Sequence, residues 1–120
     1  FGPATVPHLA GLRPPIQPSN HLETLTASRD WKRMRRSGLW GNQDIERWLG
    51  SSIDIWINGQ YQPRTDLTYA VLWRDGLMAR VDRYGWQAPA ALILSLLERH
   101  YAPAGTVAYH GIRLEIWRRK

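Results

Sequence analysis

The chain has 120 residues with a net charge of +6, a sequence pI near 10.3, seven tryptophans and no cysteine. This length predicts one domain whose small core the tryptophans can largely supply, and the lack of cysteine excludes disulfides, thiolate nucleophiles and cysteine-based zinc sites. No apolar run approaches the ~20 residues of a membrane-spanning helix, and the positive charge favours a polyanionic partner, either nucleic acid or an anionic membrane surface, over a merely soluble basic protein.

Residues 1–20 carry five of the eight prolines: Pro3, Pro7, Pro14, Pro15 and Pro18. Proline at this density is incompatible with a helix or a central strand. We therefore expect an extended, Pro-rich arm over residues 1–20 and a single folded domain over residues 21–120.

The densest positive charge follows the arm, around Trp31 and Met34, and consists of Arg29, Lys32, Arg33, Arg35 and Arg36. Such a run is either a solvated face beside a core tryptophan or a segment that contacts phosphates. Like charges this close repel one another, and an anionic ligand relieves that repulsion. We favour the second interpretation.

Two elements are expected between residues 42 and 57. Asn42 caps a short helix that Gly50 ends, with three apolar residues facing inward: Ile45, Trp48 and Leu49. Alternating isoleucines over residues 53–57 predict a strand, and Asn58-Gly59 predicts a type I′ turn after it.

Residues 67–82 are central to the prediction and have the pattern of a β-hairpin. Large apolar residues occupy alternate positions in both runs: Leu67, Tyr69, Val71 and Trp73, then Leu77, Ala79 and Val81. A three-residue loop at Arg74-Asp75-Gly76 places both sets on one buried face, whereas a two-residue turn would bury Arg80. The opposite face is then open for a ligand and carries Thr68, Arg74, Met78 and Arg80.

A helix is expected from Pro89, with an apolar stripe that covers the hairpin: Leu92, Ile93, Leu96 and Leu97. Pro103 and Gly105 end this helix. Strands are expected at residues 106–109 and 112–117, joined by a turn at His110-Gly111 and followed by a basic tail at residues 118–120. The predicted fold class is α+β, with about four strands in a mostly antiparallel sheet and helices on one face.

No motif in the sequence carries a reaction. The four histidines have neither metal-ligand spacing nor an adjacent carboxylate cluster: His8, His21, His100 and His110. Phosphate-binding loops and dinucleotide fingerprints are absent. We therefore expect no enzyme activity, no catalytic residues, no metal and no cofactor, although a metal-free ribonuclease built on two histidines and a lysine would leave no linear signature.

Several short patterns follow one another in a fixed order over roughly residues 31–103. They are Lys32-Arg33, Leu49-Gly50-Ser51 at a helix end, a strand from Thr68-Tyr69 toward Arg74 and Gly76, an apolar helix, and Ala102-Pro103. This order and spacing resemble the RNA-silencing suppressors of tombusviruses and aureusviruses, small plant-virus proteins that bind double-stranded RNA as homodimers.

The resemblance implies a homodimer in the host cytoplasm, with its two sheets joined into one concave surface for an RNA duplex. Hydroxyl and basic side chains would contact phosphates and 2′-hydroxyls, which suits the shallow minor groove of A-form RNA. The implied function is a suppressor of RNA silencing that sequesters small interfering RNA and longer duplexes without reading their sequence. The predicted RNA-binding residues are Lys32, Arg33, Arg35, Arg36, Thr68, Arg74, Met78 and Arg80.

The sequence departs from this family in three respects, one of which is that residues 53–59 form a shorter stretch than the family counterpart and have the pattern of a strand and a turn. Ala70, Met78 and Arg80 stand where the family carries serines and threonines, so we expect fewer 2′-hydroxyl contacts and more charge attraction. No tryptophan precedes Trp31, whereas the tombusvirus members stack two N-terminal tryptophans on the duplex ends. The chain is therefore closer to the aureusvirus type, and we expect no selection for duplex length.

Two other functions stay open. Trp40-Gly41 and Gly85-Trp86 are dipeptides of the kind that hook Argonaute proteins, which would make the chain an interaction module with host Argonaute as its partner. A DNA-binding regulator would need a polar and basic recognition helix, and the long helix predicted here is too apolar. No membrane partner is expected.

Overall fold

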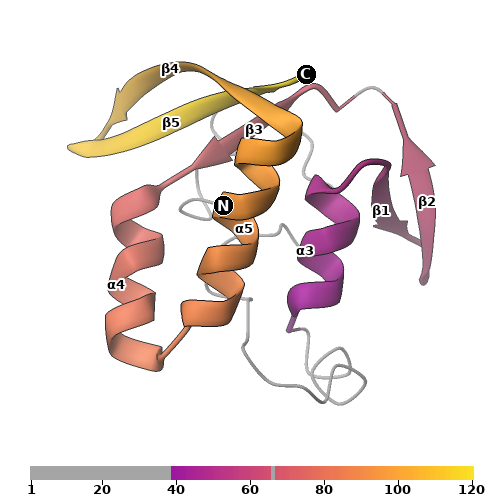
Figure 1. Cartoon of the computed structure of the whole chain (residues 1–120), viewed down its shortest axis with the longest axis horizontal. Helices are drawn as coiled ribbons and strands as arrows, with labels where there is room; N and C mark the ends of the chain where they lie inside the picture. The colour runs from indigo at the N-terminus through magenta and orange to yellow at the C-terminus, as the bar shows by residue number, and fades with distance from the viewer. Residues whose placement is uncertain (1–38, 66) are drawn as a thin grey trace.

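A computed structural model describes residues 39–65 and 67–120. Within these ranges the elements are α3 (Asn42–Leu49), β1 (Ile53–Ile57), β2 (Gln60–Arg64), β3 (Tyr69–Leu72), α4 (Arg74–Tyr84), α5 (Gln87–His100), β4 (Tyr101–Tyr109) and β5 (Ile112–Arg119). The strands form a two-stranded sheet, β1-β2, and a three-stranded sheet in the order β3-β5-β4, all antiparallel. In Figure 1 the helices stand side by side under the three-stranded sheet, with β1 and β2 next to α3. The predicted α+β class is confirmed.

The predicted hairpin over residues 67–82 is wrong. Its first run contains strand β3, but its second run belongs to helix α4. In this helix Leu77 is fully buried, and Met78 and Val81 pack against the same core. Gly85 ends the helix in the left-handed conformation, and its N–H donates to the carbonyl of Val81 at 3.0 Å. A short run with three alternating apolar residues fits a strand and a helix alike, and burial of Leu77 with the glycine stop favours the helix.

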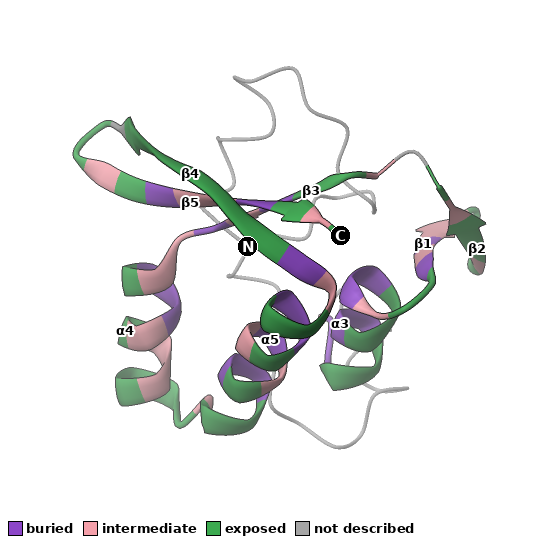
Figure 2. Ribbon diagram, turned by 45° about the horizontal axis from the view of Figure 1, so that its top comes forward, coloured by how far each residue is buried: buried purple, intermediate pink, exposed green. Residues whose placement is uncertain are grey.

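The face of β3 that meets the helices is also the opposite of the predicted one. Ala70 and Leu72 are buried, whereas Tyr69 is 59% exposed (Figure 2). The reason is the identity of the partner strand, because β3 pairs with β5 and Ala70 lies opposite Trp117. Trp117 is buried in the helical core, and the small Ala70 beside it leaves room for the indole.

Strand β5 is the centre of the three-stranded sheet, with β3 on one side and β4 on the other. The strands predicted at residues 106–109 and 112–117 are confirmed, and the turn between them has positive φ at His110 and Gly111. Strand β4 already begins at Tyr101, directly after α5, so Pro103 and Gly105 lie inside a strand where the register shifts. Proline has no N–H to donate to a neighbouring strand. An edge strand tolerates it because one side of that strand makes no hydrogen bonds within the sheet.

Helices α3 and α5 supply more than half of the residues in the buried core cluster. Helix α5 begins at Gln87 rather than at Pro89, which lies within the first turn where proline is tolerated. Helix α3 begins at Asn42, and its cap is Gly41, whose N–H donates to Oδ2 of Asp44 at 2.9 Å. The predicted inward residues of both helices are buried or pack against the core: Ile45, Trp48, Leu49, Leu92, Ile93, Leu96 and Leu97.

Aromatic rings attach the two-stranded sheet to α3. The turn of this hairpin has positive φ at Asn58 and Gly59, as the predicted type I′ turn requires. The ring of Trp56 on β1 lies 6.2 Å from the ring of Trp40, which lies 5.5 Å from the ring of Trp48 on α3. Edge-to-face and tilted pairs at these distances stabilise a contact beyond the area that they bury.

Candidate nucleic-acid interface

Half of the predicted RNA-binding residues lie outside the described residues: Lys32, Arg33, Arg35 and Arg36. The other four do not share one sheet face. Thr68 directly precedes β3, whereas Arg74, Met78 and Arg80 belong to α4. Their predicted common surface depended on a strand over residues 77–82, and the helix removes it.

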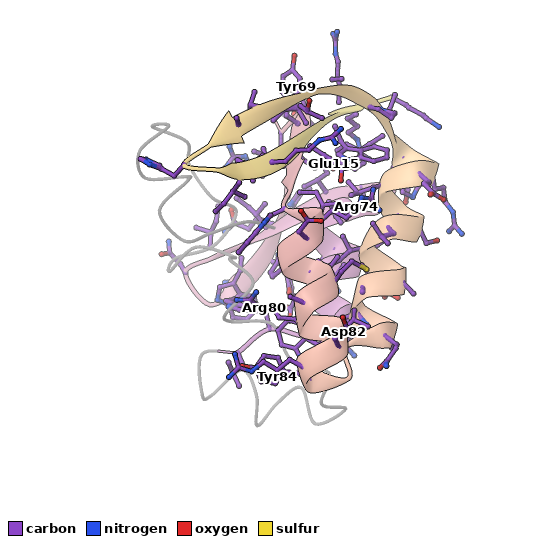
Figure 3. The ribbon with its side chains drawn as sticks, turned by 90° about the vertical axis from the view of Figure 1, so that its left-hand side faces the viewer. Tyr69, Arg74, Arg80, Asp82, Tyr84 and Glu115 are labelled. Atoms are coloured by element: carbon purple, nitrogen blue, oxygen red, sulfur yellow. The ribbon has the colours of Figure 1, made fainter. Side chains whose placement is uncertain are left out.

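Arg74 connects the start of α4 to the central strand. Its Nε donates to Oε2 of Glu115 at 2.6 Å, and its Nη2 donates to Oε1 at 2.9 Å, so the pair is bidentate (Figure 3). The hydrogen bonds from Arg74 hold the pKa of Glu115 below its usual range, and those to Glu115 raise the pKa of Arg74. Because its charge is matched within the fold, Arg74 is a weak candidate for a phosphate contact.

Met78 and Arg80 also serve the fold. Met78 is partly buried and packs against the core. Nη1 of Arg80 donates to the carbonyl of Gly76 at 3.2 Å, and its guanidinium lies 6.0 Å from the centre of the Trp73 ring. Arg80 therefore lies along its own helix, held by backbone and ring contacts, rather than on a flat sheet surface.

Thr68 is exposed at a corner where the start of β3, the end of β5 and the end of α5 meet (Figure 1). The N–H of Arg119 donates to the carbonyl of Thr68 at 2.7 Å, and the N–H of Lys120 donates to the carbonyl of His100 at 3.0 Å. These bonds bring the ends of α5 and β5, which carry five basic residues, next to the start of β3 at Thr68. We call the set the basic corner: Thr68, Arg99, His100, Arg118, Arg119 and Lys120.

Three cations of the basic corner lie close enough to His100 to affect its pKa. Partial burial lowers the pKa of His100, and the charges of Arg119, Arg99 and Lys120 lower it further. An anion bound at this corner would oppose the second effect and raise the pKa of His100. The corner is therefore arranged to attract negative charge.

Two cations of the basic corner stabilise helix ends. Nη2 of Arg119 donates to the carbonyl of Gly50 at 2.9 Å and also to the carbonyl of Ser51, where α3 ends. Nζ of Lys120 donates to the carbonyl of Glu98 at 3.2 Å in the last turn of α5. Basic side chains at these positions satisfy terminal carbonyls and complement the helix dipole.

Arg99 and Arg118 are the two exposed arginines of the basic corner. Neither side chain forms an ion pair with any residue that the structure describes. The sequence alone predicts a basic tail at residues 118–120 and gives no direct connection between this tail and Thr68. The signal in the sequence is a pair of short basic runs separated by 17 residues (Arg99-His100 and Arg118-Arg119-Lys120), and the strand order brings them together.

The tryptophans of the described chain are mostly structural. Trp40, Trp48 and Trp117 are 4%, 3% and 7% exposed. The Trp40-Gly41 dipeptide therefore lies in the core. Trp86, in the Gly85-Trp86 dipeptide, precedes α5 and is partly buried against the same core.

Residues 39–65 and 67–120 contain neither of two other kinds of feature, a cluster of metal ligands or a membrane-spanning helix. No group of three or more histidine, aspartate or glutamate side chains in these ranges could hold a metal ion. Over the same ranges no helix has the length and apolarity needed to cross a membrane. No protein-family model, curated protein or solved structure matches the chain.

Proposed function

We propose that this protein binds double-stranded RNA without reading its sequence and that the basic corner contacts the phosphate backbone. The observation that carries the proposal is the convergence of Arg99, Arg118 and their basic neighbours around the exposed Thr68. Mutual repulsion of these charges is relieved when phosphates replace water and counterions at the surface. Sequestration of RNA from a silencing machinery, as a homodimer in the host cytoplasm, is the wider role that the resemblance implies.

Thr68 is singled out both by the family resemblance and by its position in the fold. It is a residue that the family resemblance implies as a 2′-hydroxyl or phosphate contact, and it borders a cationic surface that the resemblance did not supply. The shallow minor groove of A-form RNA presents phosphates and 2′-hydroxyls together, so a hydroxyl among exposed arginines suits it. Contacts to phosphates and sugars position a duplex but carry no sequence information, so this kind of binding does not require a site that reads the bases.

The alternatives are less well supported by the fold. An Argonaute hook needs an accessible tryptophan, and Trp40 is 4% exposed. A recognition helix for DNA needs a polar and basic exposed side, whereas α5 exposes Ala91, Ser95 and Glu98 along much of its length. An Argonaute hook does not account for the basic corner, and the comparison of RNA with DNA duplexes separates the DNA-binding alternative, because cations attract the phosphates of both.

The test compares RNA and DNA duplexes of one sequence over a range of salt concentrations. We expect tighter binding of the RNA duplex. The double substitution Arg99→Ala with Arg118→Ala should weaken binding of all duplexes alike and reduce the salt slope by slightly less than about one unit per lost phosphate contact.

The matched control is Arg83→Ala, which removes an exposed arginine from α4, outside the basic corner. It should leave duplex affinity nearly unchanged. Equal affinity for the RNA and DNA duplexes would contradict shape recognition of A-form RNA. A double variant that binds like the unmodified protein would contradict the role of the basic corner.

A further inference from the structure

An exposed aromatic side chain lies beside the basic corner on the outer face of the three-stranded sheet. Tyr69 is 59% exposed and projects from the sheet away from α4 and α5 (Figure 3). Its cross-strand partner is Arg118 on β5, and the next residue in that row is Ala102 on β4. Residues opposite each other in antiparallel strands have Cβ atoms about 4.5–5.5 Å apart. The phenol ring and the guanidinium therefore share one surface.

The neighbours of Tyr69 keep its surroundings flat and apolar. Ala102 projects little, and the next row of the same face carries the partly buried Val71 and Ile116. A sheet surface with an exposed aromatic ring and an adjacent cation has the composition that stacks unpaired bases. The ring meets the face of the base, and the guanidinium meets the phosphate of the same nucleotide.

We propose that the basic corner has a second ligand, an unpaired nucleotide of single-stranded RNA, whose base stacks on Tyr69 and whose phosphate pairs with Arg118. The inference rests on the proposed function, because the same cations attract both ligands. It adds a different activity, since a base inside a duplex is already covered on both faces and offers no free face to Tyr69.

The fold provides a matched control in Tyr84. This residue is 57% exposed, and the guanidinium of Arg83 lies 5.4 Å from the centre of its ring. It lies at the end of α4, whereas Tyr69 begins strand β3, and Figure 3 shows the two at opposite ends of the molecule. Tyr84→Ala therefore removes the same ring, equally exposed and beside an arginine, but away from the basic corner.

The experiment measures binding of the full chain to a labelled single-stranded RNA of about ten nucleotides, to the same strand with abasic sites, and to a blunt RNA duplex. Tyr69→Ala should weaken binding of the intact strand about five- to a hundred-fold, the range typical of removing a stacking ring. Tyr69→Phe and Tyr84→Ala should bind it like the unmodified protein. On the abasic strand Tyr69→Ala and the unmodified protein should bind alike.

A second readout needs no substitution. A strand carrying 2-aminopurine should lose fluorescence when the unmodified protein binds it, because stacking quenches that base. Three results would overturn the inference. They are no binding of the single-stranded RNA, equal binding of the intact and abasic strands, or equal binding of the intact strand by Tyr69→Ala and the unmodified protein. None of these results bears on the duplex, so loss of duplex affinity in the variant lacking Arg99 and Arg118 tests the proposed function separately.

Discussion

Arg118 and Arg119 are adjacent on β5 but face opposite sides of the sheet. Substitution of Arg119 should therefore affect the stability of the fold, and substitution of Arg118 should affect the affinity for RNA. Arg119→Met keeps the apolar stem and removes the guanidinium that holds the end of α3. Each hydrogen bond from a charged donor contributes about 1.5–3 kcal/mol, and the contact of this guanidinium with the Tyr101 ring at 5.6 Å adds about 0.5–1 kcal/mol. Because the guanidinium is partly exposed, water screens these contacts and reduces their total below the simple sum, to about 2–3 kcal/mol, which corresponds to a decrease in Tm of about 10 °C.

Arg118→Met is the paired substitution. Arg118 is exposed on the outer face, so its removal should change the free energy of unfolding by no more than about 0.5 kcal/mol. The assay is urea unfolding of both variants together with their affinities for one RNA duplex. Arg119→Met should lose stability, and Arg118→Met should lose affinity. The reasoning is refuted if Arg119→Met unfolds at the same urea concentration as the unmodified protein, or if Arg118→Met is the unstable variant.

Two further substitutions test contacts of α4. Because Arg74 lowers the folded-state pKa of Glu115, this ion pair stabilises the fold above the unfolded carboxyl pKa of about 4.3 and is lost as pH falls through the folded value. Glu115→Gln should therefore lower the urea midpoint at pH 7 and flatten its decrease between roughly pH 5 and 3. Gly76→Ala should lower Tm although alanine favours a helix by about 1 kcal/mol, because its Cβ would lie 2.3 Å from a ring carbon of Trp73. An increase in Tm would show that the Trp73 ring does not lie against Gly76.

Elements with a local signal could be predicted from the sequence. Asn58-Gly59 and His110-Gly111 both adopt positive φ, as their turn requires, because that preference resides in the residues themselves. The stripe of α5 around Ile93 and Leu97 is long enough to exclude a strand. Patterns of this kind do not depend on what the segment packs against.

The errors concern properties that a distant partner decides. Alternation along Tyr69–Leu72 shows that β3 has two faces but not which face is buried, and Trp117 on β5 decides this from 47 positions beyond Ala70. The same limit applies to the candidate site. Thr68 could be singled out from the sequence, whereas the cations beside it come from the ends of α5 and β5 and become neighbours only through the strand order.

The central position of β5 determines the order in which the sheet can assemble. Strand β5 follows both of its neighbours along the chain, so the pair β4-β5 can form as a local hairpin while β3 has no partner within its sheet. Joining Tyr69 to Arg118 then closes a loop of nearly fifty residues that contains α4 and α5. Long-range closure of this kind is slower than hairpin formation because chain entropy is lost before the contacts form. The corner that carries Thr68 and Arg118 therefore exists only after the slowest pairing of the sheet is complete.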